Sequence, residues 1–304
     1  MLRVSVSSAA PAIEVCQLSK RYRTGALAND EISLTIPAGT IFGVLGPNGA
    51  GKTTLVRQIT GELAPSAGQV RVCGIDVARQ ALAAKALMGV VPQEASPYLH
   101  LRPGEHLQLF ARLHGLDRRT ARHRASELLA ALGLSEHANV PASRLSGGMK
   151  RKLLVGNALV AEPPVLILDE PTTGLDPHSR REVWELVSSL RGRGTTVLIT
   201  THYMEEAEAL CDRVAVMGRG RVLATGTVEE LRNLCQNRYK ANLGEGNGLQ
   251  HETLYGKSYG EVVTELARRG ITEYAIGKTT LEDLYLELTA RPLDEEDGYA
   301  QANH

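Results

Sequence analysis

The chain has 304 residues, in which 34 lysines and arginines balance 34 aspartates and glutamates. A balanced chain has no net field to attract nucleic acid or an anionic membrane, so we expect no nucleic-acid partner. The hydrophobic fraction of 43% is typical of a folded globular protein. Four cysteines without paired spacing, Cys16, Cys73, Cys211 and Cys235, favour reduced, buried thiols over disulfides or a metal site.

The sequence also predicts a soluble chain. Its start, "MLRVSVSSAAPAIEV", lacks the long apolar core of a signal peptide. The longest uncharged stretch, residues 32–51, contains two prolines and five glycines. A membrane helix needs about 20 mainly apolar residues, so this stretch is excluded as a membrane span. Any role at a membrane therefore requires a partner.

Short β-branched runs alternate with longer helical patterns over the first two-thirds of the chain, as in parallel α/β sheets. We expect strands at 40–45, 89–91, 165–168, 196–200 and 214–217. The run 165–168 is apolar at every position, which is typical of a strand covered on both faces. Between Pro103 and Val160, leucine, alanine and arginine dominate. This block predicts a helical insertion into the α/β domain.

The strong pattern stops near residue 235, and a smaller α+β piece follows the stretch "GEGNG". Its last helical pattern is amphipathic, with apolar positions at Leu281, Leu284, Tyr285 and Leu288. Such a helix can simply cap its domain, or it can serve regulation or dimerisation. We expect an N-terminal extension (1–12), a main domain (13–235), an accessory domain (236–291) and a disordered acidic tail (292–304).

The glycine-rich stretch "LGPNGAGKTT" follows the first predicted strand and precedes the helical pattern "KTTLVRQITG". It fits G-x-x-x-x-G-K-[ST], the phosphate-binding loop, in the strand–loop–helix context that this motif requires. Backbone N–H groups and the positive end of the helix can surround an anion there. Lys52 would then reach the β- and γ-phosphates of a nucleotide, and Thr53 would bind Mg²⁺. The predicted nucleotide contacts are Gly46, Pro47, Asn48, Gly49, Ala50, Gly51, Lys52, Thr53 and Thr54.

Two carboxylates end the apolar run "VLILDEP". Asp169 stands at the carboxyl end of the predicted strand, where it can hold Mg²⁺ through water beside the phosphate loop. Glu170 is then placed to accept a proton from the water that attacks the γ-phosphate. Solvated charges at the end of a strand are the alternative, which the neighbouring phosphate loop disfavours.

The stretch "LSGGMKRK", residues 145–152, lies between these two motifs and resembles the signature of ABC transporter nucleotide-binding subunits. The pieces "KRY", "VVPQE", "LILDEP", "TGLDP" and "TTH" occur in the order of that family, over residues 13–235. The resemblance is to the branch of bacterial drug exporters, nodulation-factor exporters and animal A-type lipid exporters. It implies an α/β P-loop NTPase fold with an antiparallel β subdomain, a helical subdomain at about 95–162 and a small C-terminal accessory domain.

The resemblance implies further site residues. Tyr22 matches the aromatic residue that stacks on adenine, and Gln93 matches the glutamine that touches Mg²⁺ and the attacking water. Asp176 matches the dimer-interface loop, and His202 matches the histidine that contacts the γ-phosphate. The implied catalytic set is therefore Glu170, His202, Gln93 and Lys52, and the implied metal set is Thr53, Gln93 and Asp169.

Ser146, Gly147 and Gly148 open a predicted helix and so form a second anion site, far from the phosphate loop in sequence. In ABC transporters this signature closes over ATP that is held by the opposite subunit. The resemblance thus implies a head-to-tail dimer of two copies with two ATP molecules. Met149 stands where the family often has glutamine, and it removes a polar group from that interface.

The implied activity is ATP hydrolysis that powers export through a separate membrane permease, contacted near Gln93 in residues 93–101. The chain would then sit on the cytoplasmic face of the inner or plasma membrane. The alternative is a soluble ATPase of the family that acts on ribosomes or nucleic acid. The substrate is not determined by this chain, because the permease selects it.

Overall fold

The computed structural model describes residues 10–243 and 253–290 and divides into two compact units, 1–222 and 223–304. Most of the expected N-terminal extension and all of the expected tail (292–304) lie outside the described residues. Within the described residues no helix is long and apolar enough to span a membrane. All four cysteines are free thiols; Cys211 and Cys235 are buried as predicted, whereas Cys73 is only half-buried and Cys16 is exposed.

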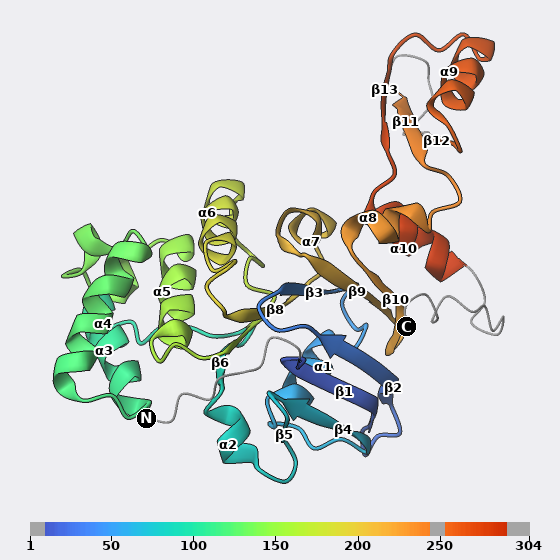
Figure 1. Cartoon of the computed structure of the whole chain (residues 1–304). Helices are drawn as coiled ribbons and strands as arrows, with labels where there is room; N and C mark the ends of the chain where they lie inside the picture. The colour runs from blue at the N-terminus through green and yellow to red at the C-terminus, as the bar shows by residue number, and fades with distance from the viewer. Residues whose placement is uncertain (1–9, 244–252, 291–304) are drawn as a thin grey trace. The chain divides into compact units, whose positions relative to one another are not determined.

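A parallel sheet forms the centre of the first unit (Figure 1). Its parallel strands lie in the order β9-β3-β8-β7-β6, and the edge strand β10 (Arg221–Gly226) contains the boundary between the units. The bounds are β3 (Ile41–Leu45), β6 (Met88–Val91), β7 (Val165–Asp169), β8 (Thr196–Thr201) and β9 (Arg213–Gly218). All five predicted strands are confirmed to within one residue at either end. Their carboxyl ends share one edge of the sheet, where the motif residues follow them.

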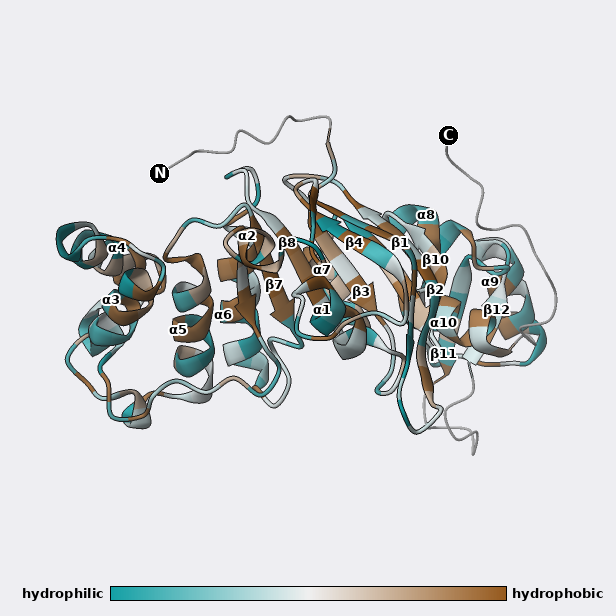
Figure 2. Ribbon diagram, turned by 90° about the horizontal axis from the view of Figure 1, so that it is seen from below, coloured by the Kyte–Doolittle hydropathy of each residue, from teal (hydrophilic) through white to brown (hydrophobic). Residues whose placement is uncertain are grey.

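A four-stranded antiparallel sheet, in the order β2-β1-β4-β5, shares its core with the parallel sheet. Its strands are β1 (Ile13–Arg21), β2 (Leu27–Ile36), β4 (Ala67–Val72) and β5 (Ile75–Asp76). Residues of both sheets and of α1 (Lys52–Ile59), such as Val15, Phe42 and Leu55, belong to one buried cluster. The central strands carry the most hydrophobic residues, as the brown ribbon in Figure 2 shows. This packing fixes the phosphate loop between β3 and α1.

The predicted helical insertion is confirmed. It contains α3 (Pro103–Leu113), α4 (Arg118–Ala131), two short 3-10 turns (Ser135–His137 and Ala142–Arg144) and α5 (Gly147–Leu159). These helices group together beside the β6 edge of the sheet (Figure 1). The remaining helices of this unit are α2 (Ala81–Lys85), α6 (Pro177–Ser188) and α7 (Met204–Leu210).

The second unit has the predicted α+β composition. Strands β11 (Tyr239–Leu243), β12 (Thr253–Gly256) and β13 (Tyr274–Lys278) form an antiparallel sheet in the order β12-β11-β13. Its helices are α8 (Val228–Asn233), α9 (Tyr259–Arg268) and α10 (Leu281–Ala290). The amphipathic pattern of α10 holds, with Leu281 and Leu284 buried. Backbone contacts place residues 223–235 in this unit because α8 packs against α10, whereas the sequence places the boundary after residue 235.

Candidate active site

The phosphate loop connects β3 to α1, and its glycines are set by backbone geometry. Gly51 caps α1 with φ +101, and a Cβ there would collide with Asn29 and with the Ala28 carbonyl oxygen. A Cβ at Gly46 would collide with the Met217 carbonyl oxygen. Only glycine fits both positions, since one needs a left-handed conformation and both face a backbone carbonyl. The loop therefore packs directly against the segments that contain Ala28 and Met217.

Lys52 is almost fully buried at the start of α1. Its Nζ donates to the carbonyl oxygens of Gly46 at 2.8 Å and of Pro47 at 3.0 Å. The same ammonium group lies 3.1 Å from Oε1 of Glu170. Lys52 thus holds its own loop and pairs with the carboxylate that follows β7.

Glu170 is the point on which the predicted catalytic residues converge. Its Oε2 lies 3.1 Å from Nδ1 of His202 and accepts hydrogen bonds from Thr173 at 3.1 Å and from Gln93 at 3.3 Å. Burial would raise the pKa of Glu170, but the hydrogen bond and charge of Lys52, aided by His202, outweigh it and lower the pKa. Glu170 is therefore ionised at neutral pH and able to accept a proton.

The backbone at Glu170 is left-handed, with φ +46, which is uncommon for a residue other than glycine. The Glu170 N–H donates to Oγ1 of Thr200 at 3.0 Å, and its nitrogen also lies 3.1 Å from the carbonyl oxygen of Thr200. Such outliers persist where surrounding contacts over-determine them, and they cluster at active sites. The turn aims the side chain back at Lys52 rather than along β7.

Asp169 differs from its neighbour in its electrostatics. Burial raises the pKa of Asp169, and hydrogen bonds from the hydroxyls of Thr200 and Thr53 only partly offset this effect. The contact with Thr53 brings together two of the three predicted metal ligands. A hydroxyl, a carboxylate and the Gln93 amide are oxygen donors of the kind that Mg²⁺ prefers. These three residues therefore fit Mg²⁺. The described residues contain no group of three or more His, Cys, Asp or Glu side chains that could hold a metal ion.

A cavity of about 390 Å³ opens over the phosphate loop. It is lined by Ala28, Asn48, Gly49, Gly51, Lys52, Thr53, Thr54, Gln93 and Glu170. Tyr22 does not line it, but its hydroxyl lies 3.3 Å from Oγ1 of Thr54 and its side chain is 36% exposed. Tyr22 is thus near the loop and partly exposed, with Nζ of Lys20 over its ring at 5.7 Å from the centroid.

The signature residues do not line this cavity. Ser146 caps α5, and its hydroxyl accepts from the backbone N–H of Met149 at 3.2 Å. Ser146 and Gly147 are exposed, whereas Gly148 is buried against α6, where a Cβ would meet Oγ of Ser179 at 2.7 Å. The structure therefore presents an open helix N-terminus that its own phosphate loop does not use.

Asp176 caps α6 in the same manner, and it too lies outside the cavity. Its carboxylate accepts from the backbone N–H groups of His178 and Ser179, both at 3.0 Å, and from the Ser179 hydroxyl at 2.7 Å. Hydrogen bonds from the Ser179 backbone and hydroxyl and from His178 lower the pKa of Asp176. Because Gly148 packs on the same Ser179, the starts of α5 and α6 are held together.

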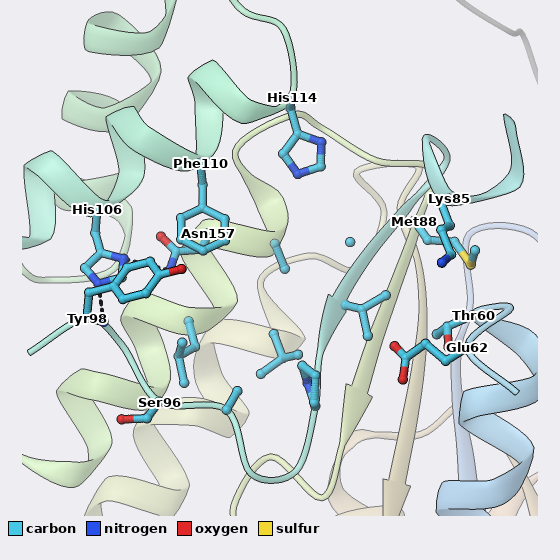
Figure 3. A pocket seen from close by; sticks show the side chains of 17 residues that line it. Thr60, Glu62, Lys85, Met88, Ser96, Tyr98, His106, Phe110, His114 and Asn157 are labelled. Atoms are coloured by element: carbon cyan, nitrogen blue, oxygen red, sulfur yellow. Dashed lines mark hydrogen bonds between the residues drawn. The ribbon is translucent and has the colours of Figure 1, made fainter. Parts of the chain in front are cut away.

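A second cavity, of about 450 Å³, involves part of residues 93–101. Figure 3 shows His106 and Phe110 of α3 with Asn157 of α5 on one wall, and Met88, Thr60 and Glu62 on the other. Tyr98 lies on the same wall as His106, with its ring stacked on the imidazole, and its backbone N–H donates to Nε2 of His106 at 2.7 Å. The cavity thus lies between the helical insertion and the sheet domain.

Sequence reasoning missed the threonines and one glutamate that support the site. Thr173 and Thr200 bind Glu170, and the Thr172 hydroxyl donates to the buried Glu206 at 2.7 Å. The spacing of Glu206 from Leu210 on the short helix α7 was a signal, because it places an acidic residue on the buried face. Their contacts could not be deduced, since they join segments that are distant in sequence.

Comparisons with known proteins agree with this geometry. The family model "ABC transporter" matches residues 29–173. The chain is 49% identical to the daunorubicin resistance ATP-binding protein DrrA3 of Streptomyces coeruleorubidus, over 73% of this chain and 70% of that protein. It is 39% identical to the Nod factor export ATP-binding protein I of Paraburkholderia xenovorans, over 93% of this chain and 99% of that protein.

A solved structure of an ATP-binding subunit of an ABC transporter superposes with a TM-score of 0.68 at 27% identity, over 91% of this chain and 99% of that one. The fold expected from the sequence is therefore confirmed. The Nod factor export relative matches nearly the whole chain, and the structure brings the phosphate loop and the acid pair together at one edge of the sheet. We conclude that the chain belongs to the ATP-binding subunits of ABC transporters, whose activity is ATP hydrolysis.

Proposed function

We propose that this chain is the MgATP-hydrolysing subunit of an export-type ABC transporter. The observation that carries the proposal is the convergence of Lys52, Gln93 and His202 on Glu170. An ionised carboxylate beside an imidazole can orient a water molecule and take its proton as the γ-phosphate is attacked. Lys52, released from Glu170 by the incoming phosphates, would neutralise their charge.

Thr53, Gln93 and Asp169 would hold Mg²⁺, with Asp169 acting through water. The ion would supply neutralisation of the β- and γ-phosphate oxygens. The raised pKa of Asp169 supports this role, because a carboxylate whose burial outweighs the nearby charge of Lys52 is stabilised when a further cation arrives. Asp169 thus favours the ion-bound state over the empty one.

Two copies would form a head-to-tail dimer. The exposed start of α5 supports this proposal, since Ser146 and Gly147 lie outside the cavity over their own phosphate loop. Each signature would close over ATP held by the other copy, with Tyr22 on the adenine and Asp176 at the interface. The positive end of a 13-residue helix adds favourable charge for the γ-phosphate.

A separate permease would dock at the cavity drawn in Figure 3. Residues 93–101 contribute to its lining, and Tyr98 and Leu99 are 53% and 48% exposed beside it. An apolar rim of this kind fits a helix presented by a partner protein. Because Gln93 starts this segment and also touches Glu170, docking and hydrolysis would be coupled through one short stretch of chain.

The relatives named above favour export over action on ribosomes, because their names concern drug resistance and Nod factor export. This chain would therefore lie on the cytoplasmic face of the membrane through its permease. Affinity purification of the tagged chain from gently solubilised membranes tests this proposal. A stoichiometric polytopic membrane protein is expected, whereas recovery with ribosomes alone would overturn the transport role.

Glu170→Gln tests the hydrolytic role. The variant should bind ATP and dimerise, but it should hydrolyse ATP at least about a hundredfold more slowly, because the amide cannot accept the proton. The exposed neighbour of Gln93, Glu94, offers a matched control, and Glu94→Gln should hydrolyse ATP normally. Normal turnover in Glu170→Gln would remove Glu170 from the role of base.

A further inference from the structure

Glu206 on α7 is a carboxylic acid with no exposed surface. Its Oε1 accepts hydrogen bonds from the Thr172 hydroxyl at 2.7 Å and from the indole Nε1 of Trp184 at 2.8 Å. Its Oε2 has no well-formed hydrogen bond within the described residues. Neither donor is charged, so the carboxyl group lacks a directly bonded cation.

A group in this condition costs stability. Burial raises the pKa of Glu206, and its neutral hydrogen-bond donors and the nearby charge of Arg180 offset this effect only in part. A buried acid that is held only by neutral hydroxyl and indole donors is less favourable than an apolar side chain of similar size. Stabilisation of the fold therefore does not explain Glu206, and its partners point to another role.

The three residues of this cluster belong to three functional segments. Thr172 follows Glu170 in the loop that leads to Asp176. Trp184 lies on α6, the helix that Asp176 caps. Glu206 itself lies on α7, four residues after His202, which precedes that helix. One carboxyl group thus joins the base, the interface loop and the segment that carries the histidine.

A second contact joins α6 to the segment that carries His202. The Arg180 guanidinium carbon lies 4.2 Å from the centroid of the Tyr203 ring, as in a cation–π contact. The Tyr203 ring in turn contacts the ring of His202, with centroids 4.1 Å apart. Helix α6 therefore contacts this segment at two points: Arg180 contacts Tyr203 just before α7, and Trp184 contacts Glu206 within α7.

The opposite face of α6 packs against the signature helix. Gly148 allows α5 to approach Ser179, and Nζ of Lys152 lies 3.4 Å from Oε1 of Glu182. Helix α6 is consequently held to the signature on one side and to the His202 segment on the other. A movement of α6 would be passed to both.

We propose that Glu206 is a positioning residue for His202, which it locks to α6 through Trp184 and to the Glu170 loop through Thr172. A shift of α6 at its Asp176 end then moves His202 relative to Glu170. The proposal rests on the hydrolytic roles of Glu170 and His202 given above. Misplacing a catalytic group by about 1 Å can cost about a hundredfold in rate, so such a device can control turnover.

Glu206→Gln in the full chain is the first test, and the exposed neighbour gives the matched control Glu205→Gln. We expect Glu206→Gln to lower kcat about tenfold while the KM for ATP changes less than about twofold, because the ATP contacts lie elsewhere. Glu205→Gln should match the wild type in both constants. Equal kcat in the two variants would overturn the proposal.

Trp184→Phe keeps an aromatic ring on α6 and removes only the N–H that Glu206 accepts. It should also lower kcat, and the double variant Trp184→Phe/Glu206→Gln should be no slower than the slower single variant, since both remove one linkage. Multiplied effects would contradict a shared role. If Glu206→Gln does not fold, Trp184→Phe alone decides, and normal kcat in it overturns the proposal.

Two further measurements separate positioning from general weakening of the fold. Trp184 is the single tryptophan of the chain, so its fluorescence reports this contact directly. MgATP should change the emission of the wild type and of Glu205→Gln, and the change should be lost in Glu206→Gln. In a His202→Ala background, single-turnover hydrolysis should be the same with and without Glu206→Gln. A further loss there would show that Glu206 does not act through His202.

Failure of the positioning role of Glu206 can be distinguished from failure of the role of Glu170 as the base. If Glu170→Gln retains turnover, the proposed chemistry fails whatever Glu206 does. If Glu170→Gln is inactive while Glu206→Gln equals Glu205→Gln, only the positioning role fails.

Discussion

Nζ of Lys52 and Oε1 of Glu170 lie 3.1 Å apart, and both side chains are almost fully buried. Lys52 follows β3 and Glu170 follows β7, so the ion pair joins the carboxyl ends of two strands that are separated in the sheet by β8. The remaining hydrogen bonds of Lys52 go to carbonyl oxygens of its own loop. The pair therefore ties the shape of the phosphate loop to the charge of the base.

Removing the lysine should leave the buried Glu170 carboxylate without the ammonium group that pairs with its Oε1. We expect Lys52→Met to lose ATP binding and to lower the free energy of unfolding by about 3 kcal/mol. The double variant Lys52→Met/Glu170→Gln should recover most of that stability, because no unpaired charge remains. Urea unfolding measures stability and calorimetry measures binding, with the exposed Lys278→Met as control. A double variant as unstable as Lys52→Met would contradict the role of the pair.

Substitution of two glycines with left-handed backbones can distinguish the cost of conformational strain from the cost of steric collision. Gly25 has φ +89, and a Cβ there meets no described atom within 4 Å. Gly51 has φ +101, and a Cβ there collides with Asn29 and Ala28. Gly25→Ala should cost about 1 kcal/mol of stability. Gly51→Ala should lower the stability by about 1–3 kcal/mol more than Gly25→Ala does, and it should abolish ATP binding. Equal losses in urea unfolding would show that the collision is relieved.

The proposed head-to-tail dimer predicts complementation between two inactive variants. Lys52→Ala removes the phosphate-loop lysine, and Ser146→Arg blocks the start of the signature helix. A mixed dimer would hold one intact composite site and one doubly damaged site. An equimolar mixture of the two variants should therefore recover about a quarter of wild-type ATPase activity if the sites act independently. A mixture as inactive as its components would argue against shared sites.

His106 should make stability depend on pH. Its Nε2 accepts the Tyr98 N–H, so the neutral ring carries its proton on Nδ1. Burial, with a smaller effect of the charge of His100, lowers the pKa of His106. A pKa below the unfolded value means that the unfolded chain binds the proton more tightly. The free energy of unfolding should thus fall as the pH drops below about 6.5.

His106→Gln supplies an amide oxygen that can accept the Tyr98 N–H and does not titrate. The stability advantage of the wild type over this variant should therefore be smaller at pH 5 than at pH 7, as measured by urea unfolding at both values. His178→Gln, at an exposed position, should keep the pH dependence of the wild type. An advantage that does not change with pH would show that the ring does not titrate in this range.

Much of the fold could be predicted because its signals are local. The buried runs before Gly46, Asp169 and His202 are apolar and β-branched, and they form β3, β7 and β8 where expected. The antiparallel strands β1, β2 and β4 were not assigned residue by residue. They alternate buried and exposed positions and contain bulges, which shift the pattern along the strand.

The sequence by itself determined the phosphate loop, the acid pair and the glycine-led signature helix, because each is written in a short stretch of chain. Only the tertiary structure decided that Lys52, Gln93 and His202 meet at Glu170, since this depends on the order of strands in the sheet. Glu206 became visible only through Thr172 and Trp184 for the same reason. Local propensity follows neighbours along the chain, whereas a site at the edge of a parallel sheet is built from loops that no local pattern connects.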